Sequence, residues 1–275
     1  MLYRKFNPCR ELEPLVECYY VWETYDDDPR KIFESPPNGF CSIVFNSGTP
    51  YYLGNSKYER LRVPDQFIAG QAIYSYKLYV PAPVMIAGIV FKPAALNTLY
   101  GIPVYEYTEE RVPLSKVFRH AFLDPFIRNI AKGTAEDKAR LLEHFVLEEY
   151  NIRKPSIDAI DIAANKIIET NGMLNITELL NTIYMSRRTF ERNFFRKVGL
   201  SPKYYARIRR IGYLANLIAG KKAVDWNEMF TQAAFYDHSH LIRDFLEFTG
   251  RTPQQYLEEN LELANFIRKP SSENL

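Results

Sequence analysis

The chain has 275 residues, 47% of them hydrophobic, and a formal net charge of +2, as is ordinary for a soluble globular protein of two domains. Its first ten residues carry charges and no apolar stretch follows them, which excludes a secretory signal. The longest apolar run, residues 84–91, is too short to span a bilayer, so we expect a cytoplasmic protein with no membrane partner.

Residues 1 to about 120 have the pattern of a β-rich domain. Aromatic and β-branched runs such as 40–45 and 84–91 alternate with turn sequences such as 46–50. Many short strands with close turns predict a barrel or a sandwich. Twenty-two of residues 1–122 are Phe, Trp or Tyr. They either line a pocket for an apolar or aromatic effector or fill a β core, which is the commoner role.

Helical patterns follow Pro113. Thr134 and Asp137 have the spacing of a helix N-cap. An apolar stripe on the helix 134–150 comes after them, formed by Leu141, Leu142, Phe145 and Val146. Residues 153–156 are the best candidate linker. The next predicted helix, Ile157 to Thr170, has a continuous apolar stripe and closes at Asn171-Gly172, two residues that tolerate the left-handed conformation.

Two segments of the C-terminal part, 175–186 and 225–236, match each other. Both segments open with a pair of helix-capping residues, and corresponding residues of the two segments are at first 50 positions apart. One extra residue in the second segment then makes this separation 51. Each copy predicts a helix, a tight turn and a second helix. Helical spacing defines the buried faces of the second helices, which are Phe190, Phe194 and Val198 after a Ser186 cap, and Leu241, Phe245 and Phe248 after an Asp237 cap.

Charge gathers on the first copy. Between Ser186 and Lys222 there are 11 basic residues and a single acid, Glu191. Such a stripe predicts contact with a polyanion. The outward faces of the two second helices then carry the candidate DNA-binding residues, which are Arg187, Arg188, Glu191 and Arg192 in the first copy and His238, Ser239 and Arg243 in the second, with Ile242 beside them.

These side chains have the chemistry of major-groove contacts. Arginine can bond guanine O6 and N7 with two hydrogen bonds, which suits Arg188, Arg192 and Arg243. Glu191 either accepts from cytosine N4 or orients Arg188 or Arg192. His238 and Ser239 either contact DNA or cap their helix.

At this point the chain from about Ser156 to Ile267 resembles the DNA-binding domain of AraC/XylS-type regulators. The resemblance rests on Met185-Ser186 with Arg192 and Phe194, on Gly199 to Pro202, Tyr205 and Arg209, and on the second series Ala234, Phe235, Asp237, Ser239, His240, Arg243, Phe245, Gly250, Pro253 and Tyr256. It implies seven helices, with 207–219 as the long connector between two recognition helices, and double-stranded DNA as partner.

The N-terminal part is similar to a sensor domain attached to some of these regulators, through residues 15–22, 36–39, 70–71 and 88–95. That similarity implies a cupin-like β-barrel for sensing or dimerisation. We therefore expect an α+β protein in which residues 1–122 form the sensor, 123–155 a helical linker and 156–268 the DNA-binding domain. The expected function is sequence-specific, effector-responsive transcription regulation by a homodimer, with RNA polymerase as a further partner if it is an activator.

The chain departs from the family pattern at four positions. The family usually has Ala in the middle of the first helix of each unit and Gly at the turn. Here Leu180 and Tyr184 stand in the first copy, and Phe230 and Ala234 in the second. A left-handed turn would strain at Tyr184 by roughly 1 kcal/mol or more. These departures keep an alternative open, a degenerate paralogue that acts as a protein-interaction module without specific DNA binding.

The residues argue against an enzyme. Cys9, Cys18 and Cys41 are an odd number without CxxC spacing, and no histidine lies in the strand region. No nucleotide-binding, nucleophile-elbow or HExxH motif occurs. We therefore expect no catalytic site, no metal and no cofactor.

Overall fold

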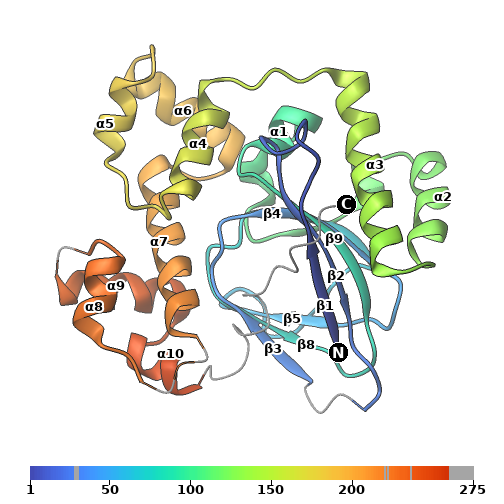
Figure 1. Ribbon diagram of the computed structural model, residues 1–275, viewed down its shortest axis with the longest axis horizontal. Coiled ribbons are helices and arrows are strands. Elements are labelled where there is room, and N and C mark those ends of the chain that lie inside the picture. The colour runs from blue at the N-terminus through green and yellow to red at the C-terminus, as the bar shows by residue number, and fades with distance from the viewer. Residues whose placement is uncertain (28–30, 220, 222, 236, 260–275) are drawn as a thin grey trace.

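The computed structural model describes residues 1–27, 31–219, 221, 223–235 and 237–259. Its N-terminal part consists of two antiparallel sheets (Figure 1). The six-stranded sheet has the order β1 (Leu2–Phe6), β2 (Val16–Glu23), β9 (Met85–Phe91), β4 (Cys41–Asn46), β7 (Gln66–Ala69) and β10 (Arg111–Pro113). The four-stranded sheet has the order β3 (Ile32–Ser35), β8 (Tyr76–Tyr79), β5 (Tyr52–Gly54) and β6 (Leu61–Arg62).

The predicted β-rich domain is confirmed, but not the closed barrel. Within the described residues the two sheets are separate and share no paired strands. Side chains alternate along each strand, so the six-stranded sheet has two different faces. On β4, Ile43 and Phe45 enter the core that packs against a helix, whereas Val44 enters the cluster shared by the two sheets.

Helical segments follow the last long strand. They are α1 (Ala95–Tyr100), the 3₁₀ turns η1 (Val104–Tyr107) and η2 (Leu114–Lys116), α2 (His120–Ile130) and α3 (Ala135–Arg153). The capping box expected at Thr134 is present, because its hydroxyl accepts from the Asp137 amide while the Asp137 carboxylate accepts from the Thr134 amide. Leu142, Phe145 and Val146 are fully buried against the six-stranded sheet. This stripe is therefore covered by the chain's own sheet and is not available to form a dimer.

The C-terminal part contains seven helices within the described residues, the number that the resemblance implied. They are α4 (Ala159–Glu169), α5 (Ile176–Asn181), α6 (Arg187–Val198), α7 (Pro202–Ile218), α8 (Trp226–Gln232), α9 (His238–Thr249) and α10 (Pro253–Glu259). Asn171 and Gly172 adopt the left-handed conformation that was predicted to end α4, with φ of 50° and 76°. Residues 260–268 of the expected domain lie outside the described residues.

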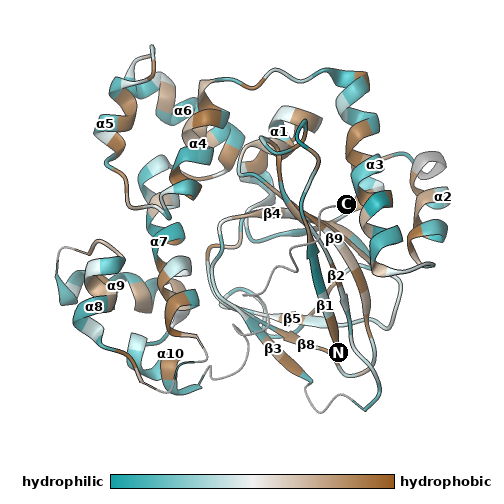
Figure 2. Ribbon diagram, viewed as in Figure 1, coloured by the Kyte–Doolittle hydropathy of each residue, from teal (hydrophilic) through white to brown (hydrophobic). Residues whose placement is uncertain are grey.

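The helix α7 connects two helix pairs, which we call the first pair (α5 and α6) and the second pair (α8 and α9) (Figure 1). The two pairs lie near opposite ends of α7, on the side of the molecule away from α3. Brown and teal alternate along most of these helices in Figure 2, as expected for helices that bury one apolar face.

The turns of the two pairs differ in a way that the sequence did not indicate. Tyr184 is not among the residues with positive φ, and it is fully exposed, so the strain predicted there is absent. Ala234 takes the left-handed conformation instead, with φ of 49°. The helix α5 has six residues and α8 has seven, so the two turns begin at different points of the repeat. Leu180 and Phe230 fit as partly buried members of the helical core.

Candidate DNA interface and interdomain cavity

The outer face of α6 is strongly basic. Ser186 caps the helix by accepting from the Thr189 amide at 3.3 Å, and its inner face is fully buried, as predicted. Arg188 and Arg192 are exposed and form no ion pair within the described residues. The carboxylate of Glu191 accepts from Arg187 Nε at 2.9 Å, so it orients Arg187 rather than Arg188 or Arg192. The outer face of α6 therefore exposes the guanidinium groups of Arg188 and Arg192, which lie one helical turn apart.

The outer face of α9 is less charged. Asp237 is the cap, accepting from the His240 amide at 2.7 Å, so neither His238 nor Ser239 has that role. Both are exposed, and the ring of His238 packs against Phe230 with centroids 3.6 Å apart. Arg243 is exposed and forms no ion pair within the part of the chain that the structure describes.

Several residues of the basic stripe are engaged with groups of the chain itself. Arg207 holds the buried carboxylate of Asp244 with two hydrogen bonds of 2.7 and 3.2 Å, which ties α9 to α7. Lys197 is buried and pairs with Asp161 at 2.7 Å and Asp158 at 2.8 Å. Arg210 is engaged with the Ala234 carbonyl. The charge available to a polyanion is therefore smaller than the sequence alone indicated.

The N-terminal domain holds the C-terminal end of α6. Lys197 Nζ also donates to the hydroxyl of Thr98 on α1 at 3.1 Å. The exposed ring of Phe195 stacks on Tyr105 of η1, with centroids 5.4 Å apart. Both contacts lie at the opposite end of the helix from Arg188, so they leave the basic face open.

The end of α9 is held in the same manner. The Phe248 carbonyl accepts from the Ser75 amide at 2.9 Å, and Arg251, just past the helix, forms an ion pair with Glu34 of β3. Each recognition helix is thus anchored at its C-terminus to the N-terminal domain. Both helices are therefore in direct contact with the N-terminal domain.

A third connection joins the loop 36–39 to the middle of α7. The buried hydroxyl of Tyr205 donates to the Gly39 carbonyl at 2.8 Å, and Arg209 donates to the Asn38 carbonyl. A Cβ on Gly212 would lie 2.2 Å from the Pro37 carbonyl oxygen, so only glycine permits this approach. In the sequence these residues stood out only as fragments of the family pattern. Nothing indicated that they meet.

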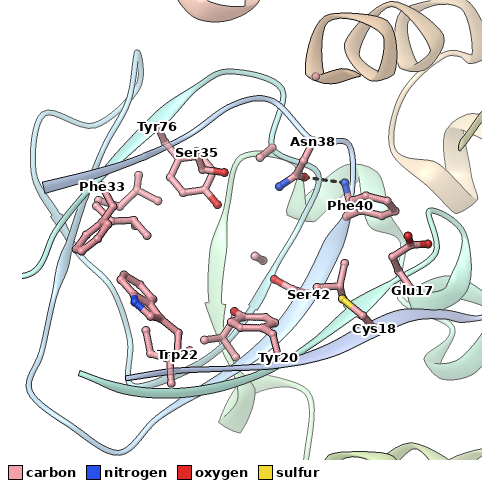
Figure 3. A pocket seen from close by; sticks show the side chains of 18 of the residues that line it. Glu17, Cys18, Tyr20, Trp22, Phe33, Ser35, Asn38, Phe40, Ser42 and Tyr76 are labelled. Carbon is pink, nitrogen blue, oxygen red and sulfur yellow. Dashed lines mark hydrogen bonds between the residues drawn. The ribbon is translucent and has the colours of Figure 1, made fainter. Parts of the chain in front are cut away.

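A cavity of about 500 Å³ lies between the two sheets. Figure 3 shows Trp22, Phe33 and Tyr76 at one end and Asn38, Phe40, Glu17 and Cys18 at the other. The lining also includes Arg209, Tyr213 and Asn216 of α7. Arg209 Nε and Asn216 Oδ1 are buried and have no hydrogen-bond partner among the described residues. The DNA-binding part of the chain therefore contributes one wall of this cavity.

The groups in the cavity are mostly neutral. Burial raises the pKa of Tyr3, Tyr20 and Tyr51 well above the ordinary phenol value. Burial also raises the pKa of the Cys18 thiol to about 11. These residues can offer hydrogen bonds but not charge.

The charged groups in the lining are unevenly matched. Glu17 forms an ion pair with Lys92, and Glu34 with Arg251, and neither cation lines the cavity. The lining also contains Arg111 and Arg209. With both carboxylates paired from outside, the cavity favours a ligand that carries a hydrogen-bond acceptor or a negative charge.

Two features are absent from the described residues, a metal-binding cluster and a membrane-spanning helix. No group of three or more His, Cys, Asp or Glu side chains in this part of the chain is arranged to hold a metal ion. None of its helices is long and apolar enough to cross a membrane.

Residues 4–113 match a protein family described as a domain of unknown function (DUF6597), and residues 179–259 match a helix-turn-helix domain family. No curated protein matches the chain. Among solved structures it is similar to ToxT from Vibrio cholerae, at 12% identity over 87% of this chain and 97% of that one, with a TM-score of 0.44. A ToxT structure from Vibrio cholerae O395 is 10% identical over 88% of this chain and 97% of that one, with a TM-score of 0.46. A ToxT structure bound to an unsaturated fatty acid is 11% identical over 86% of this chain and 94% of that one, with a TM-score of 0.43.

The matched family begins within α5 and covers α6, α8 and α9, and the outer faces of α6 and α9 carry exposed arginines. The C-terminal part of the chain is therefore a helix-turn-helix DNA-binding domain. The doubled motif is of the AraC type, which supports a role in transcription regulation.

Proposed function

We propose that this protein is a sequence-specific, effector-responsive transcription regulator that reads duplex DNA with α6 and α9. One observation carries the proposal. Two similarly capped helices expose Arg188, Arg192 and Arg243, which have no ion-pair partner in the part of the chain that the structure describes, while the inner faces of both helices are fully buried. A guanidinium on a short helix can enter the major groove and bond guanine O6 and N7.

The seven candidate residues have different proposed roles. Arg192 and Arg243 read base edges, and Arg188 contacts a base or a phosphate. Arg187 is oriented by Glu191 toward the backbone of the duplex. Ser239 contacts a base or a phosphate, and His238, which packs on Phe230, contacts DNA only through the edge of its ring.

The test is binding of the full chain to duplex DNA as a function of salt. We expect affinity to fall by about 10³-fold or more between 50 and 200 mM salt if roughly six phosphates are contacted. Selection from a random duplex library should return a defined motif. A binding affinity that does not change with salt concentration would contradict the proposal, and so would a selection that returns no enriched motif. Either result would favour the alternative of a protein-interaction module.

The cavity is the proposed effector site. Its aromatic lining suits a planar apolar body, and the unpartnered Arg209 Nε suits an acceptor or anionic group on that body. A ligand in contact with both Arg209 and the sheets changes the free energy of docking between the two parts of the chain. By linkage, it changes DNA affinity by the same factor by which DNA changes ligand affinity.

A fluorescent probe can test the cavity before any effector is known. Anilinonaphthalene sulfonate has an aromatic body and one anionic group, and we expect it to bind. Ser42, which lines the cavity, allows a filling variant: Ser42→Trp should abolish dye binding and leave the fold intact. A matched exposed variant on α7, Lys203→Gln, should have no effect. Equal dye binding by Ser42→Trp and the unmodified chain would contradict the site.

The remaining assignments are proposals that rest on this function. We propose residues 1–122 as the sensor, 123–155 as a helical linker and 156–268 as the DNA-binding domain, within the cytoplasm. Regulators with paired recognition elements commonly bind as two-fold dimers, so we expect a homodimer, and contact with RNA polymerase if the protein activates. Light scattering that detects only monomer at high micromolar concentration would contradict the dimer.

A further inference from the structure

The two recognition helices can be compared residue by residue, because the repeat places them at an offset of 51. Arg192 of α6 corresponds to Arg243 of α9. Glu191 corresponds to Ile242, and Phe195 to Leu246. At two positions of the same face, the second helix therefore has an aliphatic side chain where the first has an acid or an aromatic ring.

These aliphatic side chains are partly exposed. Ile242 is 40% exposed and Leu246 is 41% exposed, one helical turn apart. The equivalent of Leu246, Phe195, is stacked on Tyr105 of the N-terminal domain. Ile242 has Arg243 beside it and Ser239 in the preceding turn, both on the outward face.

We propose that Ile242 reads the 5-methyl group of a thymine in the half-site bound by the second pair. This inference rests on the proposed function, because it takes the outer face of α9 to be the face that enters the groove. The thymine methyl is the apolar group among the base edges of the major groove, and an aliphatic side chain can bury it but cannot hydrogen-bond. Ile242 therefore prefers thymine over cytosine at one position.

The continuity of this patch with Arg243 identifies DNA as the occupant. A partner protein would need a larger apolar area than two side chains, since specific interfaces bury about 800 Å² on each partner. Leu246, one turn further along, extends the apolar strip beside the same base. The first pair has Glu191 at the matching position, so we expect no such preference for thymine in the half-site of the first pair.

The experiment removes single methyl groups from the DNA. A duplex selected by the full chain is remade with deoxyuridine in place of each thymidine in turn. Loss of the contacted methyl should reduce affinity about fourfold, the factor for roughly 0.8 kcal/mol per buried carbon group, and the other substitutions should have little effect. Ile242→Ala should bind the thymidine and deoxyuridine duplexes equally.

The matched control is Ile162→Ala on α4, where an isoleucine is 63% exposed away from both recognition helices. It should keep the full thymidine preference. If no deoxyuridine substitution matters while the selected motif is still bound, or if Ile242→Ala keeps the preference, this inference is wrong and the proposed function stands. If selection yields no motif, the proposed function fails as well.

Discussion

The first and second helix pairs share a scaffold and differ in surface. Both recognition helices begin at a side-chain cap, bury three apolar residues at helical spacing and end at a left-handed glycine. The outer face of α6 has three arginines, whereas that of α9 has one arginine with a serine, a histidine and an isoleucine. The inner face is constrained by packing, and the outer face is constrained only by what it contacts.

The two pairs also differ in their attachment to the N-terminal domain. The first is held by the buried network around Lys197, and the second by the ion pair between Arg251 and Glu34 and by the Phe248 carbonyl. Undocking the first pair leaves the ion pair between Lys197 and Asp161 intact, because both residues lie in the C-terminal part. Undocking the second pair separates the buried Glu34 from Arg251, and removing one partner of a buried ion pair is costly.

The largest predicted effect concerns the shared scaffold. Phe194→Ala and Phe245→Ala occupy equivalent, fully buried positions and should each lower the free energy of unfolding by about 3–5 kcal/mol. Denaturant unfolding measures this. The exposed control Ile162→Ala should change stability by less than about 0.5 kcal/mol. A large effect at one phenylalanine and none at the other would show that the two inner faces are not equivalent.

The next effect concerns the outer faces. Arg192→Ala and Arg243→Ala should each weaken specific binding by about 1–3 kcal/mol and relax preference at a few base pairs, because each removes a bidentate contact. We expect the larger loss at Arg192, since α6 carries more charge. Lys221→Ala, between the pairs, should weaken binding to all sequences alike.

Selection from a random duplex library measures this difference. If Arg192→Ala and Lys221→Ala return the same motif at the same relative enrichment, Arg192 does not read bases. The second contrast residue, Lys222, lies outside the described residues.

A smaller effect concerns the caps. Ser186→Ala and Asp237→Ala remove the acceptors of the first free amides of α6 and α9, and each should cost about 1 kcal/mol of stability. Ser186→Asp should keep the stability of the first pair, because aspartate is an equally good cap. If thermal unfolding shows no change in stability for either alanine variant, the caps do not stabilise the two helix pairs.

The smallest effect separates the two turns. Ala234 has a left-handed backbone, so Ala234→Gly should stabilise the protein by about 0.5–1 kcal/mol. Tyr184 does not have that backbone, so Tyr184→Gly should give no gain. Parallel thermal melts test this, and a gain at Tyr184 would mean that both turns have the same geometry.

The sequence by itself determined the local features. The caps at Thr134, Ser186 and Asp237, the end of α4 at Asn171 and the buried faces of the recognition helices were all predicted, because each depends on residues within one or two helical turns. The doubled motif also predicted the family and the outward position of Arg188, Arg192 and Arg243.

Tertiary structure decided everything that depends on distant pairs. Tyr205 meets Gly39 across 166 positions of sequence, and Arg251 meets Glu34 across 217. No local pattern indicates which partner a basic side chain takes, so Arg207 and Lys197 looked like part of a DNA-facing stripe until their buried carboxylates were located. The open sheets, and the cavity completed by α7, follow from the same cause: periodicity fixes which face of an element is buried, but not what covers it.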